Sequence, residues 1–167
     1  MKVLFLDIDG VLNCEASRLM AHNQKAGDFA THRAWLDGAV EELKRIIKET
    51  GCQIVISSDW RLCNVPNLQA AFKNEELPNW LGFTPELGKN NWHNMNRGRE
   101  VAAWIAAAEA EGDKVESFAI VDDNDWFMPD QQSRFVHTSD TQGMTKDDAD
   151  DIIWILNHGP RRKDPTT

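Results

Sequence analysis

The stretch FLDIDGVLN, residues 5–13, carries the strongest pattern in this chain of 167 residues. An apolar, β-favouring run over Val3–Leu6 changes abruptly to Asp7, Asp9 and Gly10, which predicts a buried strand that ends in a loop. A helix-capping or turn pair is the alternative interpretation of the two aspartates. The apolar run directly before Asp-x-Asp-Gly disfavours that alternative, so we expect a functional loop here.

The rest of the chain alternates between apolar runs and segments with helical spacing. Such alternation, with each strand apolar throughout, predicts a mainly parallel sheet with helices on both faces. A Thr145–Asp148 pair resembles the capping residues that open a helix. The further strands are expected over 53–57, 117–121 and 134–136, and the helices over 36–50, about 97–112 and about 146–156.

Polar side chains follow three of the expected strands. In a parallel sheet a ligand binds at the carboxyl ends of the strands, so we expect these side chains to share one crevice. Four clustered carboxylates repel one another unless a cation lies between them, and hard oxygen ligands favour Mg²⁺. The five histidines are scattered without ligand spacing, which disfavours zinc. The strand-end residues are Asp7 and Asp9, Ser57 and Ser58, and Asp122 and Asp123.

Composition excludes several classes of protein. The chain has 18 Lys and Arg against 27 Asp and Glu, a net charge of −9, which argues against a general nucleic-acid coat and sequence-specific DNA binding. No apolar run is long enough for a membrane helix. The three cysteines lack CxxC spacing, which favours a reduced, cytoplasmic setting. We expect one domain over 1–158 and a flexible tail over 159–167.

Three motifs together resemble the haloacid dehalogenase (HAD) superfamily: FLDIDGVLN at 5–13, SDWR at 58–61 and AIVDDND at 119–125. Within that superfamily the chain is similar to the small, nearly capless phosphatase-like domains of phages and of bacterial RNA-repair assemblies, the Swiss Army Knife type. The resemblance implies a three-layer Rossmann-like α/β fold. It also implies no full cap domain and only a small insert at about 62–96.

The resemblance assigns roles to the aspartates. Asp7 is implied to be the nucleophile that forms an aspartyl-phosphate, and Asp9 the general acid and base. Mg²⁺ is implied to bind the carboxylate of Asp7, the main-chain carbonyl of Asp9 and Asp123, with Asp122 close by. An acidic residue two positions after the nucleophile marks the phosphatases of this superfamily.

A phosphate-binding group is also implied. Ser58 is expected to bind the phosphate, with Ser57 as the alternative because a strand end is uncertain by one residue. Arg97 is expected to steady the transferring phosphoryl group, with Lys89 as the alternative. Gly10 is expected to permit a tight turn that brings backbone N–H groups near the phosphate.

These expectations define a Mg²⁺-dependent phosphomonoesterase acting on a nucleotide or a nucleic-acid terminal phosphate. Two alternatives stay open: a catalytically silent HAD-like module that binds a phosphorylated partner, and a phosphotransferase to an acceptor other than water. Trp60 and Arg61 are interpreted as packing residues, with substrate contact as the alternative.

Overall fold

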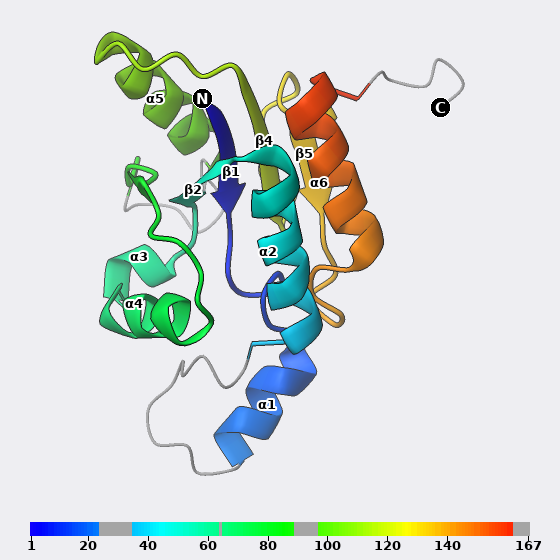
Figure 1. The fold of residues 1–167 in the computed structure, drawn as a ribbon. Helices are drawn as coiled ribbons and strands as arrows, with labels where there is room; N and C mark the ends of the chain where they lie inside the picture. Colours follow the sequence, from blue (N-terminus) through cyan, green and yellow to red (C-terminus); the bar gives the residue numbers. More distant parts are fainter. Residues whose placement is uncertain (24–34, 64, 89–96, 162–167) are drawn as a thin grey trace.

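The fold is known from a computed structural model, which describes residues 1–23, 35–63, 65–88 and 97–161. Its centre is a five-stranded sheet in the order β3-β2-β1-β4-β5, and every strand pair is parallel (Figure 1). The predicted parallel α/β architecture is therefore confirmed. The strands are β1 (Lys2–Leu6), β2 (Gln53–Ile56), β3 (Gly82–Phe83), β4 (Ser117–Asp122) and β5 (Phe135–His137).

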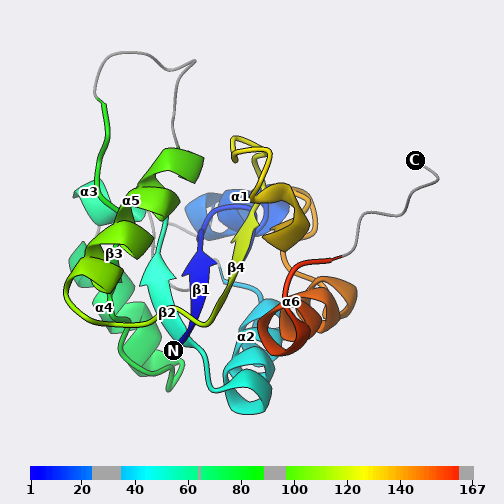
Figure 2. The same ribbon diagram turned by 90° about the horizontal axis from the view of Figure 1, so that it is seen from above.

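Helices cover both faces of this sheet, which gives three layers (Figure 2). On one face α2 (Asp37–Thr50) and α6 (Lys146–His158) lie side by side, and α5 (Arg97–Ala110) covers the other face. Thr145 closes a reciprocal capping box with Asp148 at the start of α6, as the sequence predicted. α2 leads back to the start of β2 and α5 to the start of β4, so the loops that follow β1, β2 and β4 lie together at the carboxyl end of the sheet.

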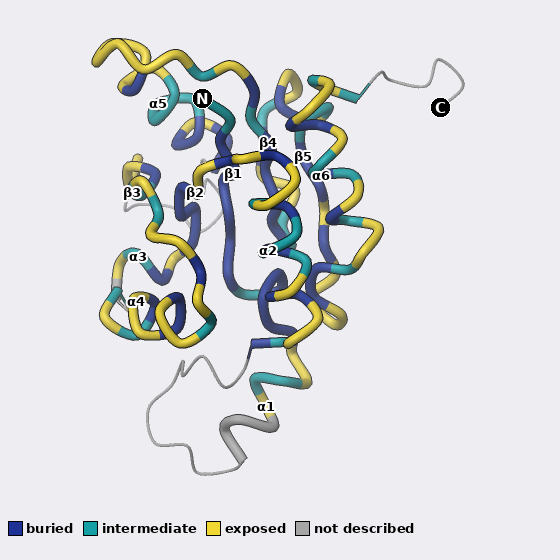
Figure 3. Tube along the Cα trace, in the orientation of Figure 1, coloured by how far each residue is buried: buried dark blue, intermediate teal, exposed yellow. Residues whose placement is uncertain are grey.

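The central part of the sheet is buried on both sides, which explains the apolar runs within β1, β2 and β4 (Figure 3). Alternate residues of β1 enter different clusters: Leu4 and Leu6 pack with α2 and α6, whereas Val3 and Phe5 pack with Val101 of α5. Asp7 continues this alternation one residue beyond the strand. Burial of the strand thus also fixes the direction in which Asp7 leaves the sheet.

Five elements were not predicted from the sequence. α1 (Glu15–Asn23) follows the first motif, and a short 3-10 helix, η2 (Gln132–Arg134), precedes β5. α4 (Val65–Asn74) and β3 lie within the segment expected to be an insert, and α3 (Trp60–Cys63) extends into it. In its described part that segment belongs to the main fold, because β3 pairs with β2 and α4 buries Leu68 and Phe72 in the core. β3 has only two residues, too few for a recognisable pattern.

The structure describes only part of the chain to which two other expectations refer, those on the tail and on membrane helices. The tail predicted at 159–167 lies largely outside the described residues, which end at Arg161. Among the residues that the structure describes, no helix combines the length and the apolar character needed to cross a membrane. Cys14 and Cys52 are both buried and unbridged.

Candidate active site

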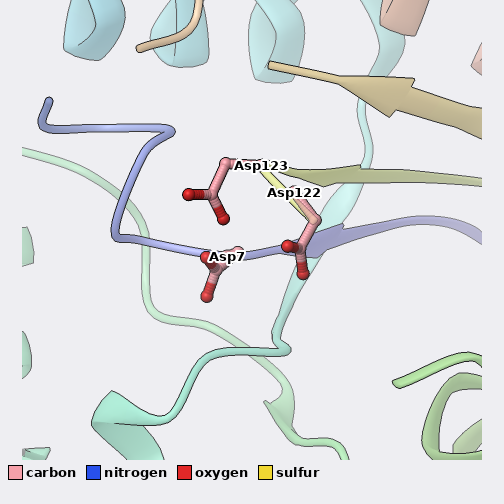
Figure 4. Close-up of side chains that lie close together, drawn as sticks. All are labelled: Asp7, Asp122 and Asp123. Carbon is pink, nitrogen blue, oxygen red and sulfur yellow. The ribbon is translucent and has the colours of Figure 1, made fainter. Parts of the chain in front are cut away.

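Three carboxylates meet at the carboxyl end of the sheet (Figure 4). Asp7 follows β1, Asp122 ends β4, and Asp123 comes next in the chain. β1 and β4 are neighbouring parallel strands, so their ends lie together, and one oxygen from each carboxylate lies within 4.8 Å of the others. The structure therefore brings together three of the four predicted aspartates. Asp9 takes a different position.

Burial dominates the electrostatics of this cluster. It raises the pKa of Asp7 well above its usual range, and repulsion from Asp122 adds to the effect. Arg97 and a hydrogen bond from Ser58 act in the opposite direction on the pKa of Asp7. Burial likewise raises the pKa of Asp122 to about 6 and raises that of Asp123. Without a cation, the cluster thus holds more negative charge than its surroundings stabilise.

The donor set fits a hard divalent cation. Oδ2 of Asp122 is buried and has no hydrogen-bond partner among the described residues, an arrangement that costs free energy unless a cation or a proton is bound. Carboxylate oxygens are the ligands that Mg²⁺ prefers, usually together with water and phosphate oxygens. Asp7, Asp122 and Asp123 can therefore hold Mg²⁺. The expected contribution of the Asp9 carbonyl stays a prediction.

We expect Asp122→Asn to stabilise the metal-free protein at pH 7.5 and to remove most of its response to Mg²⁺. A carboxyl whose pKa is raised in the folded state costs stability as the pH rises from about 4 through about 6. A pKa raised from about 4 to about 6 in the folded state lowers the free energy of unfolding by about 3 kcal/mol at high pH. Thermal unfolding at pH 4.5 and 7.5, with EDTA and with Mg²⁺, measures both effects. A variant that follows the wild type under all four conditions would contradict this account.

Asp9 is held apart from the three-carboxylate cluster by hydrogen bonds. Its Oδ1 accepts from Nδ2 of Asn13 at 2.7 Å, and its Oδ2 accepts from Nε1 of Trp60 at 2.9 Å. Nη1 of Arg18 lies 3.6 Å from Oδ1, with both side chains partly exposed. The Asp9 side chain remains 45% exposed, so a substrate can reach it.

The loop after β2 favours Ser58 over Ser57 as the phosphate-site serine. The Ser58 side chain hydrogen-bonds Asp7, and its Oγ also accepts from the backbone N–H of Trp60 at 3.4 Å. Oγ of Ser57 is buried without a hydrogen-bond partner among the described residues. Ser58 is therefore the serine that the structure places beside the expected nucleophile.

Arg97 lies beneath this loop, with its guanidinium turned toward protein atoms. Nη1 donates to the carbonyl of Ser57, and Nη2 lies 3.1 Å from Oδ1 of Asp59. The side chain is only 8% exposed. Its charge nevertheless acts on Asp7 and Asp122 by lowering the pKa of each. The alternative cation, Lys89, lies outside the described residues.

Gly10 contributes its missing side chain to the site, in addition to the tight turn predicted from the sequence. Its N–H donates to Oδ1 of Asn13 at 3.0 Å, so this amide is already paired within the loop. Its φ is +74°, and a Cβ added there would lie 2.4 Å from Oδ2 of Asp123. The missing side chain of Gly10 is therefore what allows Asp123 to approach the cluster.

Three residues of this region were missed or assigned a lesser part. The first motif ends at Asn13 and assigns it no role, although its side chain joins Gly10 to Asp9. Glu100 pairs with Arg61 at 2.8 Å, and both side chains are buried. The only available signal was their place in or near the motifs, because hydrogen-bond geometry has no local sequence pattern.

The fold has a parallel sheet between two layers of helices, with aspartates at the carboxyl ends of β1 and β4. This combination is typical of a HAD-type domain. The chain belongs to the family of HAD domains in Swiss Army Knife RNA repair proteins, whose family model matches residues 3–149. The resemblance stated from the motifs is thereby confirmed, and the family supports a phosphatase-like function. Comparisons with curated proteins and with solved structures found no match.

Proposed function

We propose that this protein is a Mg²⁺-dependent phosphomonoesterase that works through an aspartyl-phosphate. The observation that carries the proposal is the buried Asp7 carboxylate, which lies within 4.8 Å of Asp122 and Asp123 and receives a hydrogen bond from Ser58. A nucleophile beside a metal-binding pair is the arrangement that phosphoryl transfer requires. A bound Mg²⁺ supplies positive charge that offsets repulsion between these carboxylates and the phosphate oxygens.

The reaction then proceeds in two displacements at phosphorus. In the first, an oxygen of Asp7 forms a bond to phosphorus while the bond to the substrate oxygen breaks, and that oxygen takes a proton from Asp9. In the second, a water oxygen attacks the aspartyl-phosphate and gives a proton to Asp9, and the bond from phosphorus to Asp7 breaks. Inorganic phosphate leaves, and both aspartates return to their starting states.

Ser58, in the loop after β2, and Arg97, at the start of α5, support these steps. Ser58 lies beside Asp7, because it follows the neighbouring strand β2, and in this proposal its single O–H turns from Asp7 to a phosphate oxygen when substrate binds. Arg97 favours the ionised, nucleophilic form of Asp7 by lowering its pKa. In this proposal Arg97 acts through its charge and through the Ser57 carbonyl, to which its Nη1 donates, while its Nη2 donates to Asp59.

We propose a nucleotide or a nucleic-acid terminal phosphate as the substrate. The matched family is named for its occurrence in RNA repair proteins, and RNA carries terminal phosphates when its ends are phosphorylated. A cavity of about 480 Å³ includes Asp123 in its wall and offers hydroxyl and carboxylate groups that can hydrogen-bond a sugar. It is lined by Asp123, Asn124, His137, Thr138, Ser139 and Asp140.

We also propose a cytoplasmic location, because Cys14 and Cys52 are buried and unbridged, as expected in a reducing compartment. Residues 1–158 are proposed to form one domain.

We expect Mg²⁺-dependent phosphate release from 5′- and 3′-phosphorylated oligonucleotides, nucleoside monophosphates or p-nitrophenyl phosphate. The assay compares Mg²⁺ with EDTA, and a hydroxyl-rich acceptor is added to reveal transfer to an acceptor other than water. No release from any substrate would overturn the proposed hydrolase. Beryllofluoride, which mimics an aspartyl-phosphate, would then report whether a silent phosphate-binding module remains.

A further inference from the structure

The loop after β2 contacts both aspartates of the first motif. Ser58 hydrogen-bonds Asp7, and Trp60, two residues later, donates its indole N–H to Oδ2 of Asp9 at 2.9 Å. The two contacts are linked, because the backbone N–H of Trp60 also donates to Oγ of Ser58. One short segment thus sets the relative positions of the expected nucleophile and the expected acid and base.

Packing fixes the position of the Trp60 side chain. Its side chain is buried at the start of α3, with the residue only 7% exposed, and its ring lies 6.4 Å from that of Trp35. Trp35 in turn packs edge-on against Phe72 at 5.8 Å. A ring enclosed in this way cannot rotate without disturbing the core, so the direction of its N–H is fixed.

Asn13 provides the matching contact on the other oxygen. It is buried, with 1% exposure, and Nδ2 donates to Oδ1 of Asp9 at 2.7 Å. Its own orientation is determined because Oδ1 of the same amide accepts from Gly10 N–H at 3.0 Å. The ion pair with Arg18 is longer and partly exposed, so it contributes less to the position of Asp9.

We infer that Trp60 and Asn13 are positioning residues for Asp9; this inference rests on the proposed function of the same site. Each carboxylate oxygen accepts one hydrogen bond from the protein and keeps a lone pair for a proton of the substrate or of water. The plane of the carboxyl group is fixed by two donors on different segments. A tryptophan interpreted from the sequence as packing is therefore assigned a part in proton transfer.

Trp60→Phe keeps an aromatic ring and removes the indole N–H. We expect kcat to fall by about 10- to 100-fold with KM nearly unchanged, because a misplaced acid or base slows chemistry more than binding. Trp104→Phe is the matched control: Trp104 packs edge-on against Phe5 at 5.5 Å, in the cluster on the α5 face of the sheet, whereas Trp60 packs in the cluster on the other face. Equal losses in the two variants would overturn the inference.

A double-mutant cycle separates positioning from a general loss of structure. If Trp60 acts through Asp9, Trp60→Phe should cause no further loss of kcat in an Asp9→Asn protein. If the fold-loss of kcat in the double variant equalled the product of the losses in the two single variants, the inference would be overturned. Acid-quenched samples should also show more covalent phospho-enzyme in Trp60→Phe than in wild type with p-nitrophenyl phosphate, because hydrolysis of the intermediate needs the base.

A measurement without turnover distinguishes failure of this inference from failure of the proposed function. In ¹H–¹⁵N spectra, the Trp60 indole resonance, assigned by its absence in Trp60→Phe, should shift strongly in Asp9→Ala. The Trp104 resonance should stay in place. An inactive protein with this shift would overturn the phosphatase proposal and leave Trp60 as the residue that holds Asp9. An unmoved Trp60 resonance would overturn the positioning inference whatever the activity.

Discussion

Asp7→Asn is expected to release no phosphate above background, a loss of at least about 1000-fold in kcat. An amide oxygen is a poor nucleophile, and Asn cannot form the acyl-phosphate that divides the reaction into two steps. The fold should survive, because burial and the nearby Asp122 already disfavour the ionised form of Asp7. A neutral amide of the same shape removes that cost, so we expect unchanged or higher thermal stability without metal.

The assay pairs phosphate release with thermal unfolding on the same samples. Asp113→Asn provides the matched control, since Asp113 is an exposed aspartate before β4, at the opposite edge of the sheet. We expect this control to keep wild-type turnover. Full activity in purified Asp7→Asn protein would exclude the aspartyl-phosphate mechanism. Lost activity together with a lower melting temperature would point to damage of the fold instead.

Much of the fold could be predicted from the sequence because its strands are buried on both faces. The apolar run of β1 and the run Phe118–Val121 of β4 are unambiguous for that reason, and each stops at an aspartate. The capping box at Thr145 is equally local, since its two members lie three residues apart. Because the carboxyl ends of neighbouring parallel strands lie together, the parallel sheet alone predicts that Asp7, Asp122 and Asp123 are close to one another.

The parts that could not be predicted depend on contacts between distant segments. β3 forms only because β2 offers a free edge to Gly82 and Phe83, and two residues carry no periodicity. The contact between Trp60 and Asp9 spans 51 positions of the chain, so no local pattern reveals it. Arg97 is expected from the sequence to steady the phosphoryl group, and that role stays a prediction. Its donors turning to the Ser57 carbonyl and to Asp59 could not be foreseen.

Gly10→Ala is expected to reduce activity by more than about 100-fold, although it adds a single methyl group. The added Cβ would lie 2.4 Å from Oδ2 and 2.6 Å from Cβ of Asp123, closer than atoms can approach. Gly10 cannot move away, because its N–H donates to Asn13 and its carbonyl accepts from Oγ1 of Thr138 at 2.8 Å. Asp123 must therefore leave its place in the three-carboxylate cluster.

Gly51→Ala isolates the backbone part of this effect. Gly51 ends α2 with φ +66°, nearly the φ of Gly10, but a Cβ there meets no atom within 4 Å. Both variants place alanine in the left-handed region, which costs about 1–2 kcal/mol. We expect both to lower the melting temperature and only Gly10→Ala to lose phosphate release and the stabilisation by Mg²⁺. If Gly10→Ala retained phosphate release and the stabilisation by Mg²⁺, the close approach of Asp123 to the Gly10 backbone would be irrelevant to the site. Asp7 and Asp122 would then have to hold the cation without Asp123.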